Sequence, residues 1–255
     1  MFSTSTQSKC WIFKDEAQIS RLRKAANDRF ISRQQIANRS PDDFLSPEEE
    51  RTIYKHYEFT LRDFCKKFQP PVPRSVIGTS FHYFKRFYLN NSVMDYHPKH
   101  MLQRLVQATV KCLPFAKWPD VNEMRGHVYK KQSCSFYHQT RCSQFPDPEK
   151  LRIYMDDFLE RTLFTDAMLL MAPSQIALTA VLYAANKAQA NFETYITDFL
   201  FAGSPRETLH HIKDTVKKLW LMVRAIEVPP KEKVRACEQK LEKCRNQENN
   251  PDSQV

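Results

Sequence analysis

Length, composition and charge restrict the class of this protein. The chain has 255 residues, of which 42% are hydrophobic and 27% charged, so it can bury one large core or two smaller ones. An excess of 39 lysines and arginines over 29 acidic residues favours acidic or nucleic-acid partners without specifying either. Only three glycines occur, whereas dinucleotide-binding folds and P-loops need clustered glycines beside phosphate. The composition therefore excludes these enzyme classes and predicts an all-α protein.

Cysteine usage and apolar runs indicate the compartment. Seven cysteines are an odd number and show no paired spacing. No apolar stretch has the length that a signal peptide or a membrane span requires. We therefore expect free thiols, a reducing compartment (cytosol or nucleus) and no membrane partner.

The first half of the chain contains three helical patterns. The spacing of Ile19, Leu22, Ala26 and Phe30 predicts an N-terminal helix. Next, Ser46 to Glu49 form a capping box with proline at the first helical position, which satisfies the free amides of a helix start. The apolar stripe that follows consists of Ile53, Tyr57, Leu61, Phe64 and Phe68. Pro73 then opens a helix with the stripe Ile77, Phe81, Phe84 and Tyr88.

Residues 101–145 do not continue this pattern. They hold seven basic residues against two acidic ones, and after a possible helix over 101–113 no periodicity fits for about 30 residues. Cys134, His138 and Cys142, with His127 nearby, have a spacing that one helix face would need to bind zinc. Structural zinc sites usually use two short ligand pairs from separate turns. We therefore interpret these residues as incidental and expect no metal or cofactor.

Helical patterns return in the second half. Asp147-Pro148 predicts a helix start, followed by the inward-facing residues Leu151, Met155, Phe158 and Leu159. Pro173 opens a helix of small residues that contains Ile176, and residues 192–201 are compatible with a short helix. A second capping box at 204–207 precedes a stripe formed by Ile212, Val216, Leu219, Val223 and Ile226. The last stripe, Val234, Cys237, Leu241 and Cys244, is narrow and predicts a helix that docks on one partner surface.

No motif for catalysis or for reading nucleic acid is present. The sequence lacks a G-x-S-x-G, an H-E-x-x-H, a Walker lysine and a kinase signature. Lys85, Arg86 and Tyr88, together with the basic segment 101–145, offer charge for phosphate contacts, but diffuse charge gives salt-sensitive and unspecific binding. We therefore expect no catalytic residue and no specific nucleic acid.

Two long segments resemble the cyclin family. Residues 73–98, PRSVIGTSFHYFKRFYLNNSVMDYHP, resemble the second helix of a cyclin box and the start of its third helix. Residues 156–188 resemble the first two helices of a second box. The flanking segments 11–30 and 228–245 are similar to the outer helices of the cyclin of the CDK-activating kinase. The resemblance implies an all-α cyclin fold with two cyclin-box helical bundles between N- and C-terminal helices, the first box incomplete.

The expected division of the chain follows from this resemblance. It comprises an N-terminal helix and linker (1–44), a partial first box (45–100), a non-matching segment (101–145), a second box (146–227), and a C-terminal helix and polar tail (228–255). The residues expected in the cores of the boxes are Ile77, Phe81, Phe84, Tyr88, Phe158 and Ile176.

The resemblance also implies a function. Such a cyclin is not an enzyme but the regulatory subunit of a cyclin-dependent kinase, whose active state it stabilises. It works in the nucleus with a RING-finger assembly factor, on cell-cycle kinases and, within TFIIH, on the C-terminal repeats of RNA polymerase II. Because helices outside the boxes are associated with activation, the partner-binding residues implied are Phe13, Leu22, Phe30, Val234 and Leu241.

The resemblance to the cyclin family stops after His100. This break leaves two alternative functions open. Cyclins place a kinase-contacting lysine and glutamate in the third and fifth helices, for which 101–145 has no counterpart. We interpret this segment as an alternative exon or out-of-frame sequence, and expect the aromatic stripe of the first box to lack cover and the N-terminal half to pack loosely. The alternatives are a basic adaptor of cyclin fold that binds nucleic acid, and an inactive isoform that competes for cyclin partners.

Overall fold

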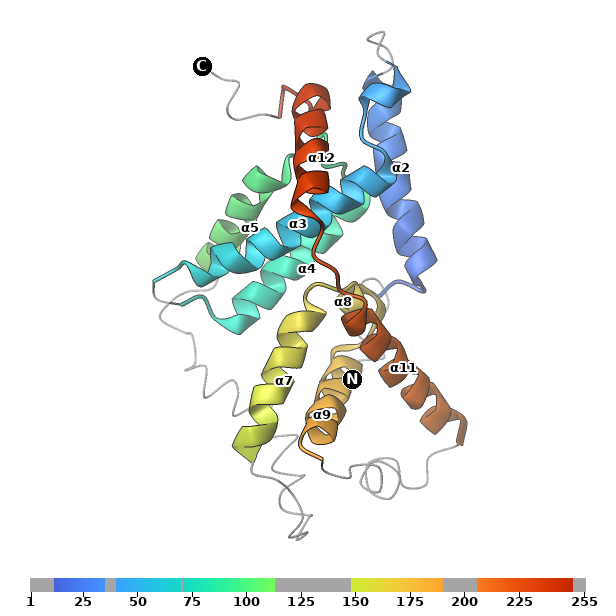
Figure 1. Cartoon of the computed structure of the whole chain (residues 1–255), viewed down its shortest axis with the longest axis vertical. Coiled ribbons are helices and arrows are strands. Elements are labelled where there is room, and N and C mark those ends of the chain that lie inside the picture. Colours follow the sequence, from blue (N-terminus) through green and yellow to red (C-terminus); the bar gives the residue numbers. More distant parts are fainter. Residues whose placement is uncertain (1–11, 35–39, 70, 113–147, 190–205, 250–255) are drawn as a thin grey trace. The chain divides into compact units, whose positions relative to one another are not determined.

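The described part of the protein is helical. The structure is a computed structural model that describes residues 12–34, 40–69, 71–112, 148–189 and 206–249 (Figure 1). These residues form helices, turns and bends, and no strand is found among them. The predicted all-α class is therefore confirmed. Contacts divide the chain into a first unit (1–110, 168–170 and 226–255) and a second unit (111–167 and 171–225).

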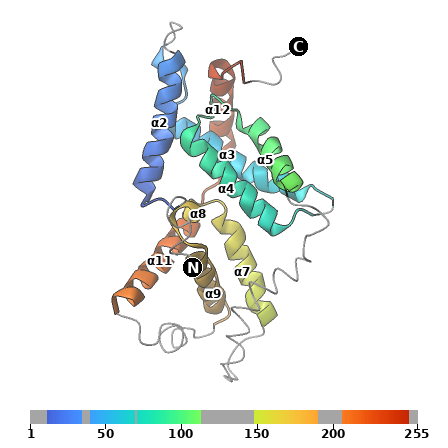
Figure 2. The same cartoon turned by 180° about the vertical axis from the view of Figure 1, so that it is seen from behind.

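The first unit combines the N-terminal half with the C-terminal end of the chain. Its helices are α2 (Glu16–Gln34), η2 (Pro41–Asp43), α3 (Pro47–Lys66), α4 (Arg74–Asn90), α5 (Pro98–Cys112) and α12 (Lys231–Cys244). Within it α3 packs on α4, α2 packs on α4, and α12 lies across α3 (Figures 1 and 2). Residues 168–170 of the short helix α8 (Ala167–Leu170) also belong to this unit.

The start of α3 is the predicted capping box. The Glu49 N–H donates to Ser46 Oγ at 3.2 Å, and the Ser46 N–H donates to Glu49 Oε2 at 2.8 Å. Both orphan amides of this helix start are thereby satisfied. In the predicted stripe, Ile53, Tyr57 and Leu61 are buried, whereas the last two members, near the end of the helix, are half-buried.

The aromatic stripe of α4 is buried, so the prediction that it lacks cover was wrong. Phe81, Phe84 and Tyr88 are at most 3% exposed, and Ile77 is half-buried. The Phe84 ring stacks on Tyr54 of α3 with centroids 5.5 Å apart. Helices α2 and α3 cover this stripe. The expectation of exposure was wrong because it considered only the missing helices of the box and not the burial that the flanking helix α2 provides.

A buried ion pair joins α3 to α4 and corrects the interpretation of Lys85. The Lys85 ammonium donates to Glu58 Oε1, and both side chains are 0% exposed. Lys55 approaches the other oxygen of the same carboxylate at 2.7 Å. Lys85 therefore contributes no charge to a basic surface, since its charge is neutralised inside the helix pair.

The second unit is a bundle around the small-residue helix. Its described helices are α7 (Pro148–Thr162), α9 (Pro173–Lys187) and α11 (Arg206–Arg224), and α9 packs on both of the others. Helix starts at Pro148 and Pro173 are confirmed. Phe158 is buried with its ring centroid 4.8 Å from that of Tyr183, while Ile176 is half-buried.

Several predictions fall partly or wholly outside the described residues. The helix expected from 101 is confirmed as α5, which extends to Cys112. The remainder of 101–145 with its zinc alternative, the helix at 192–201 and the cap at Ser204 lie outside. Among the described residues no group of three side chains is arranged to hold a metal, and no helix has the length and apolarity to cross a membrane. Cys65, Cys237 and Cys244 are free thiols.

Candidate functional site

The C-terminal helix α12 docks on the first unit along its narrow stripe. Val234, Cys237, Leu241 and Cys244 are all buried. The predicted helix is therefore confirmed, and the surface on which it docks is formed by α3 and η2 of this chain. A stripe with three- and four-residue spacing fits one neighbouring helix, which leaves the other side of α12 in solvent.

Polar contacts fix the orientation of α12 on α3. Tyr57 Oη donates to Glu238 Oε1 at 3.2 Å, and Lys240 Nζ lies 3.0 Å from Glu49 Oε2. Burial raises the pKa of Glu49, but the bonds from Ser46 and Lys240 outweigh it and hold that pKa below its ordinary value. The side chain that caps α3 thus also anchors the C-terminal helix.

The N-terminal helix α2 is held by an apolar cluster and by the segment before it. Ile19, Leu89 and Leu169 are buried together, with half-buried neighbours that include Leu22. The Phe13 N–H donates to the Leu169 carbonyl at 2.8 Å, and the Arg86 guanidinium lies 5.5 Å from the Phe13 ring centroid. Backbone pairing with residue 169 therefore fixes the entry into α2.

Four of the five predicted partner-binding residues lie on α2 and α12, and Phe13 lies in the segment before α2; all five are buried or half-buried within this chain. Phe30, Val234 and Leu241 are at most 5% exposed, and the Phe30 ring packs edge-on against Phe44 within this chain. Phe13 and Leu22 are half-buried. The resemblance selected the flanking helices, but most of the residues named on them belong to apolar stripes, which a helix buries against its own domain.

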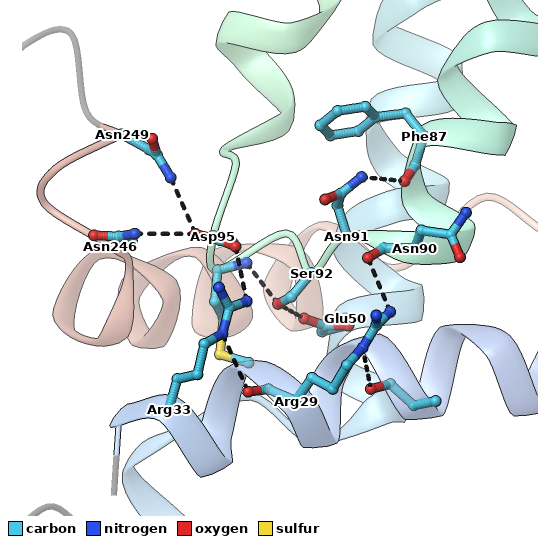
Figure 3. A network of polar contacts seen from close by, with 12 residues as sticks. Arg29, Arg33, Glu50, Phe87, Asn90, Asn91, Ser92, Asp95, Asn246 and Asn249 are labelled. Atoms are coloured by element: carbon cyan, nitrogen blue, oxygen red, sulfur yellow. Dashed lines mark hydrogen bonds and ion pairs between the residues drawn. The ribbon is translucent and has the colours of Figure 1, made fainter. Parts of the chain in front are cut away.

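A polar network that sequence reasoning missed joins α2 and the segment after α12 to the α4–α5 turn (Figure 3). The Asp95 carboxylate accepts from Arg33 Nη2 at 3.1 Å, and from Asn246 Nδ2 and Asn249 Nδ2 at 3.0 Å each. Arg29 Nη2 donates to the Asn90 carbonyl at 3.1 Å. These partners are separated by up to 154 positions in the chain, and no local pattern signals them.

A cleft lies in the first unit between α3, the start of α5 and α12. It has a volume of about 500 Å³, and its lining residues are Tyr57, His97, Lys99, His100, Arg235, Glu238, Gln239, Glu242 and Arg245. Both glutamates of the cleft bind other lining residues: Glu242 forms an ion pair with Arg245 at 3.0 Å, and Glu238 accepts a hydrogen bond from Tyr57. The cleft therefore offers charges of both signs rather than the concentrated positive charge that binds phosphate.

Comparisons with known proteins place these features in a family. A family model described as "Cyclin C-terminal domain" matches residues 134–224, so its match begins inside the segment 101–145. Cyclin-H of Xenopus laevis is 34% identical over 284 aligned residues, covering 97% of this chain and 88% of that protein. Cyclin-H1-1 of Arabidopsis thaliana is 23% identical over 95% of this chain and 88% of its own length.

Solved structures show the same fold. A chain of the CAK complex of Chaetomium thermophilum bound to ATP-gamma-S superposes with a TM-score of 0.70 at 23% identity, covering 96% of this chain and 88% of that one. A chain of the yeast TFIIK (Kin28/Ccl1/Tfb3) complex gives 0.56 at 16% identity, covering 87% and 99%. The cyclin fold is confirmed. Because a relative with one third of its residues identical spans nearly the whole chain, flanking helices included, this chain belongs to the cyclin H family.

Proposed function

We propose that this chain is the regulatory subunit of a CDK-activating kinase. In this role it binds a cyclin-dependent kinase and a RING-finger assembly factor in the nucleus. The complex phosphorylates cell-cycle kinases and, with TFIIH, the C-terminal repeats of RNA polymerase II. The observation that carries the proposal is the 34% identity to a cyclin H over 97% of the chain. The kinase performs the chemistry, and this chain contributes no catalytic group.

Kinase activation by a binding subunit is a population shift. A partner stabilises the active conformation only by the difference between its affinities for the two states. A surface that is ordered before binding loses less conformational freedom when the complex forms. In this chain α2 and α12 are fixed on the first unit by buried stripes and by bonds such as Arg33–Asp95 and Lys240–Glu49. This order supports a role in which the flanking helices present a preformed surface.

Co-expression with the kinase and the assembly factor tests the proposal. The complex is isolated by size-exclusion chromatography, and the phosphorylation of a peptide with polymerase C-terminal repeats is compared with that by the kinase alone. We expect co-elution and a higher phosphorylation rate. Separate elution of the chain and an unchanged rate would contradict the proposal.

The first alternative function is distinguished by the same experiment, and the second by a titration with duplex DNA. Co-elution without stimulation would identify a competing subunit that binds the partners but does not activate. Salt-dependent binding of duplex DNA with a base-pair preference would identify a nucleic-acid adaptor. The burial of Lys85 removes one of the residues on which that adaptor was based.

A further inference from the structure

Two buried glutamates on α3 have opposite electrostatic surroundings. Glu58 faces the ammonium groups of Lys85 and Lys55. Glu50 is only 9% exposed, and no ion pair connects it to any described residue. Its carboxylate accepts a hydrogen bond from the Ser92 hydroxyl. The Asn27 side chain and the N–H groups of Val93 and Met94 are neutral neighbours that favour its ionised form. Burial without a cation penalises the ionised form of Glu50.

The turn that Glu50 contacts also binds α2 and the segment after α12. Its backbone is closed by the N–H groups of Asp95 and Tyr96, which donate to the Ser92 carbonyl at 3.2 and 3.1 Å. One residue beyond the contacts of Glu50, Asp95 binds Arg33 of α2 and the two asparagines that follow α12 (Figure 3). The Asn246 N–H also donates to the Met94 carbonyl at 2.8 Å.

We propose that residues 92–95 form a proton-sensitive clasp, in which Glu50 holds the turn while the turn holds α2 and the segment 246–249 together. The geometry carries this proposal, because one four-residue turn contacts α2, α3 and the segment after α12. Opening the clasp exposes Glu50 to water and frees Asp95 from both flanks. Loss of the Glu50 contacts therefore loosens α2 and the segment 246–249 together.

The sign of the proton effect follows from burial. Desolvation raises the pKa of Glu50 from 4.5 to about 7, although the hydrogen bonds from Ser92, Asn27 and the turn oppose it. In the open clasp the hydrated carboxyl has a pKa near 4.5. The closed clasp therefore binds the proton more tightly, and opening becomes easier as the pH rises from about 4.5 to about 7. Acidification within this window closes the clasp.

Other titratable groups face Glu50 or the turn. Tyr88 of α4 and Cys244 of α12 lie close to Glu50, and burial raises the pKa of each, so both remain neutral in this window. Arg33 of α2 faces Asp95 as its ion-pair partner. His97, two residues beyond Asp95, accepts from the Lys99 N–H at Nδ1 and lies 3.8 Å from Glu242. An imidazole titrates in the same range, so His97 requires a control.

Amide hydrogen exchange of the full chain tests the clasp without any kinase. Exchange is followed by mass spectrometry at pH 5.5 and 7.5, with rates corrected for intrinsic chemistry. We expect peptides covering 28–34, 90–97 and 245–249 to exchange more slowly at pH 5.5, by on the order of tenfold. Peptides from α7 and α9 are expected to change little. Equal protection at both pH values in all three segments would overturn the proposal.

Three matched substitutions identify the titrating group. Glu50→Gln is expected to abolish the pH dependence in the three segments. Glu48→Gln, at an exposed position of the same helix, and His97→Gln are expected to retain it. A pH response that survives in Glu50→Gln, or disappears in His97→Gln, contradicts the assignment to Glu50.

An exposed residue tests the coupling without altering the buried carboxyl. The Arg33 side chain is 65% exposed, so Arg33→Ala leaves the core intact. We expect faster exchange at 245–249 as well as at 28–34 at both pH values, because both segments share Asp95. Faster exchange confined to 28–34 would overturn the coupling, even if Glu50→Gln does not fold.

Discussion

At the scale of single residues, the contribution of a buried charge to stability depends on the groups beside it. Glu50 and Glu58 are eight positions apart on α3 and both are buried, but only Glu58 has lysine partners. A buried pair loses more when one partner is removed than it adds when intact, because the remaining charge stays desolvated. Substitutions at the pair therefore test how α3 is held on α4.

The first prediction concerns the order of two substitutions at this pair. Glu58→Leu removes the carboxylate that faces two ammonium groups, and we expect it to lower the free energy of unfolding by about 3–5 kcal/mol. Lys85→Met leaves Glu58 with Lys55 at 2.7 Å and is expected to destabilise less. Urea denaturation of both variants measures this order. An equal or larger effect of Lys85→Met would contradict it.

The second prediction concerns acid stability. Burial lowers the pKa of His82 from 6.5 to about 4, assisted by the nearby charges of Arg86 and Lys85. The folded chain thus holds His82 neutral, and its contribution to stability is lost as the pH falls from about 6.5 towards 4. We expect His82→Gln to lose less stability over this range than the unsubstituted chain. Urea midpoints at pH 7 and 5 measure this, with exposed His211→Gln as the matched control.

At the scale of elements, local signals fixed the starts of helices, whereas their docking depended on partners elsewhere. The cap of α3 has both predicted bonds, and α9 begins at its predicted proline. The docking of α12 depends on the pairs Tyr57–Glu238 and Glu49–Lys240, whose members are 181 and 191 positions apart in the chain. We therefore expect loss of a local cap and loss of a docking contact to lower the free energy of unfolding by different amounts.

The third prediction concerns the cap of α3. Ser46→Ala removes the acceptor of the Glu49 N–H, and we expect a loss of about 1 kcal/mol in the free energy of unfolding. Ser46→Asp retains an acceptor oxygen at this position and is the matched control. Urea denaturation distinguishes the two. Equal stability of the alanine and aspartate variants would show that the cap contributes nothing.

The fourth prediction concerns the docking of α12. Leu241 is 0% exposed, so Leu241→Ala leaves a cavity between α12 and α3 and is expected to lose about 2–5 kcal/mol. If the flanking helices present the kinase-binding surface, phosphorylation of the polymerase repeats by the complex decreases as well. Lys243→Ala, at an exposed position of the same helix, is the control for both assays. Unchanged exchange protection of α12 in Leu241→Ala would contradict the docking.

At the scale of the whole molecule, the first unit is discontinuous in sequence. It takes residues 168–170 and 226–255 from beyond the segment 101–145. Leu169 completes the cluster around Ile19, and α12 covers α3. A domain boundary placed by sequence order alone therefore separates Leu169 and α12 from the helices of the first unit on which they pack.

The fifth prediction concerns the N-terminal half as an isolated fragment. Residues 1–145 alone lack Leu169 and α12, so the apolar faces that these cover become exposed to water. We expect the fragment to unfold without cooperativity and to be cleaved by protease faster than the same residues in the full chain. A protease-resistant fragment with a sharp urea transition would contradict this prediction.

The sequence by itself determined the helical class, the helix starts and the family, because caps, apolar periodicity and long motifs are local features. Phe81, Phe84 and Tyr88 were placed in the core from their spacing, and the structure buries them. Only the tertiary structure decided that Lys85 is buried, that Phe30 and Leu241 are covered by this chain, and that Asp95 joins α2 to the segment 246–249. These outcomes depend on which elements pack together. Local sequence patterns do not show which residue, distant in the chain, a charged or apolar side chain will contact.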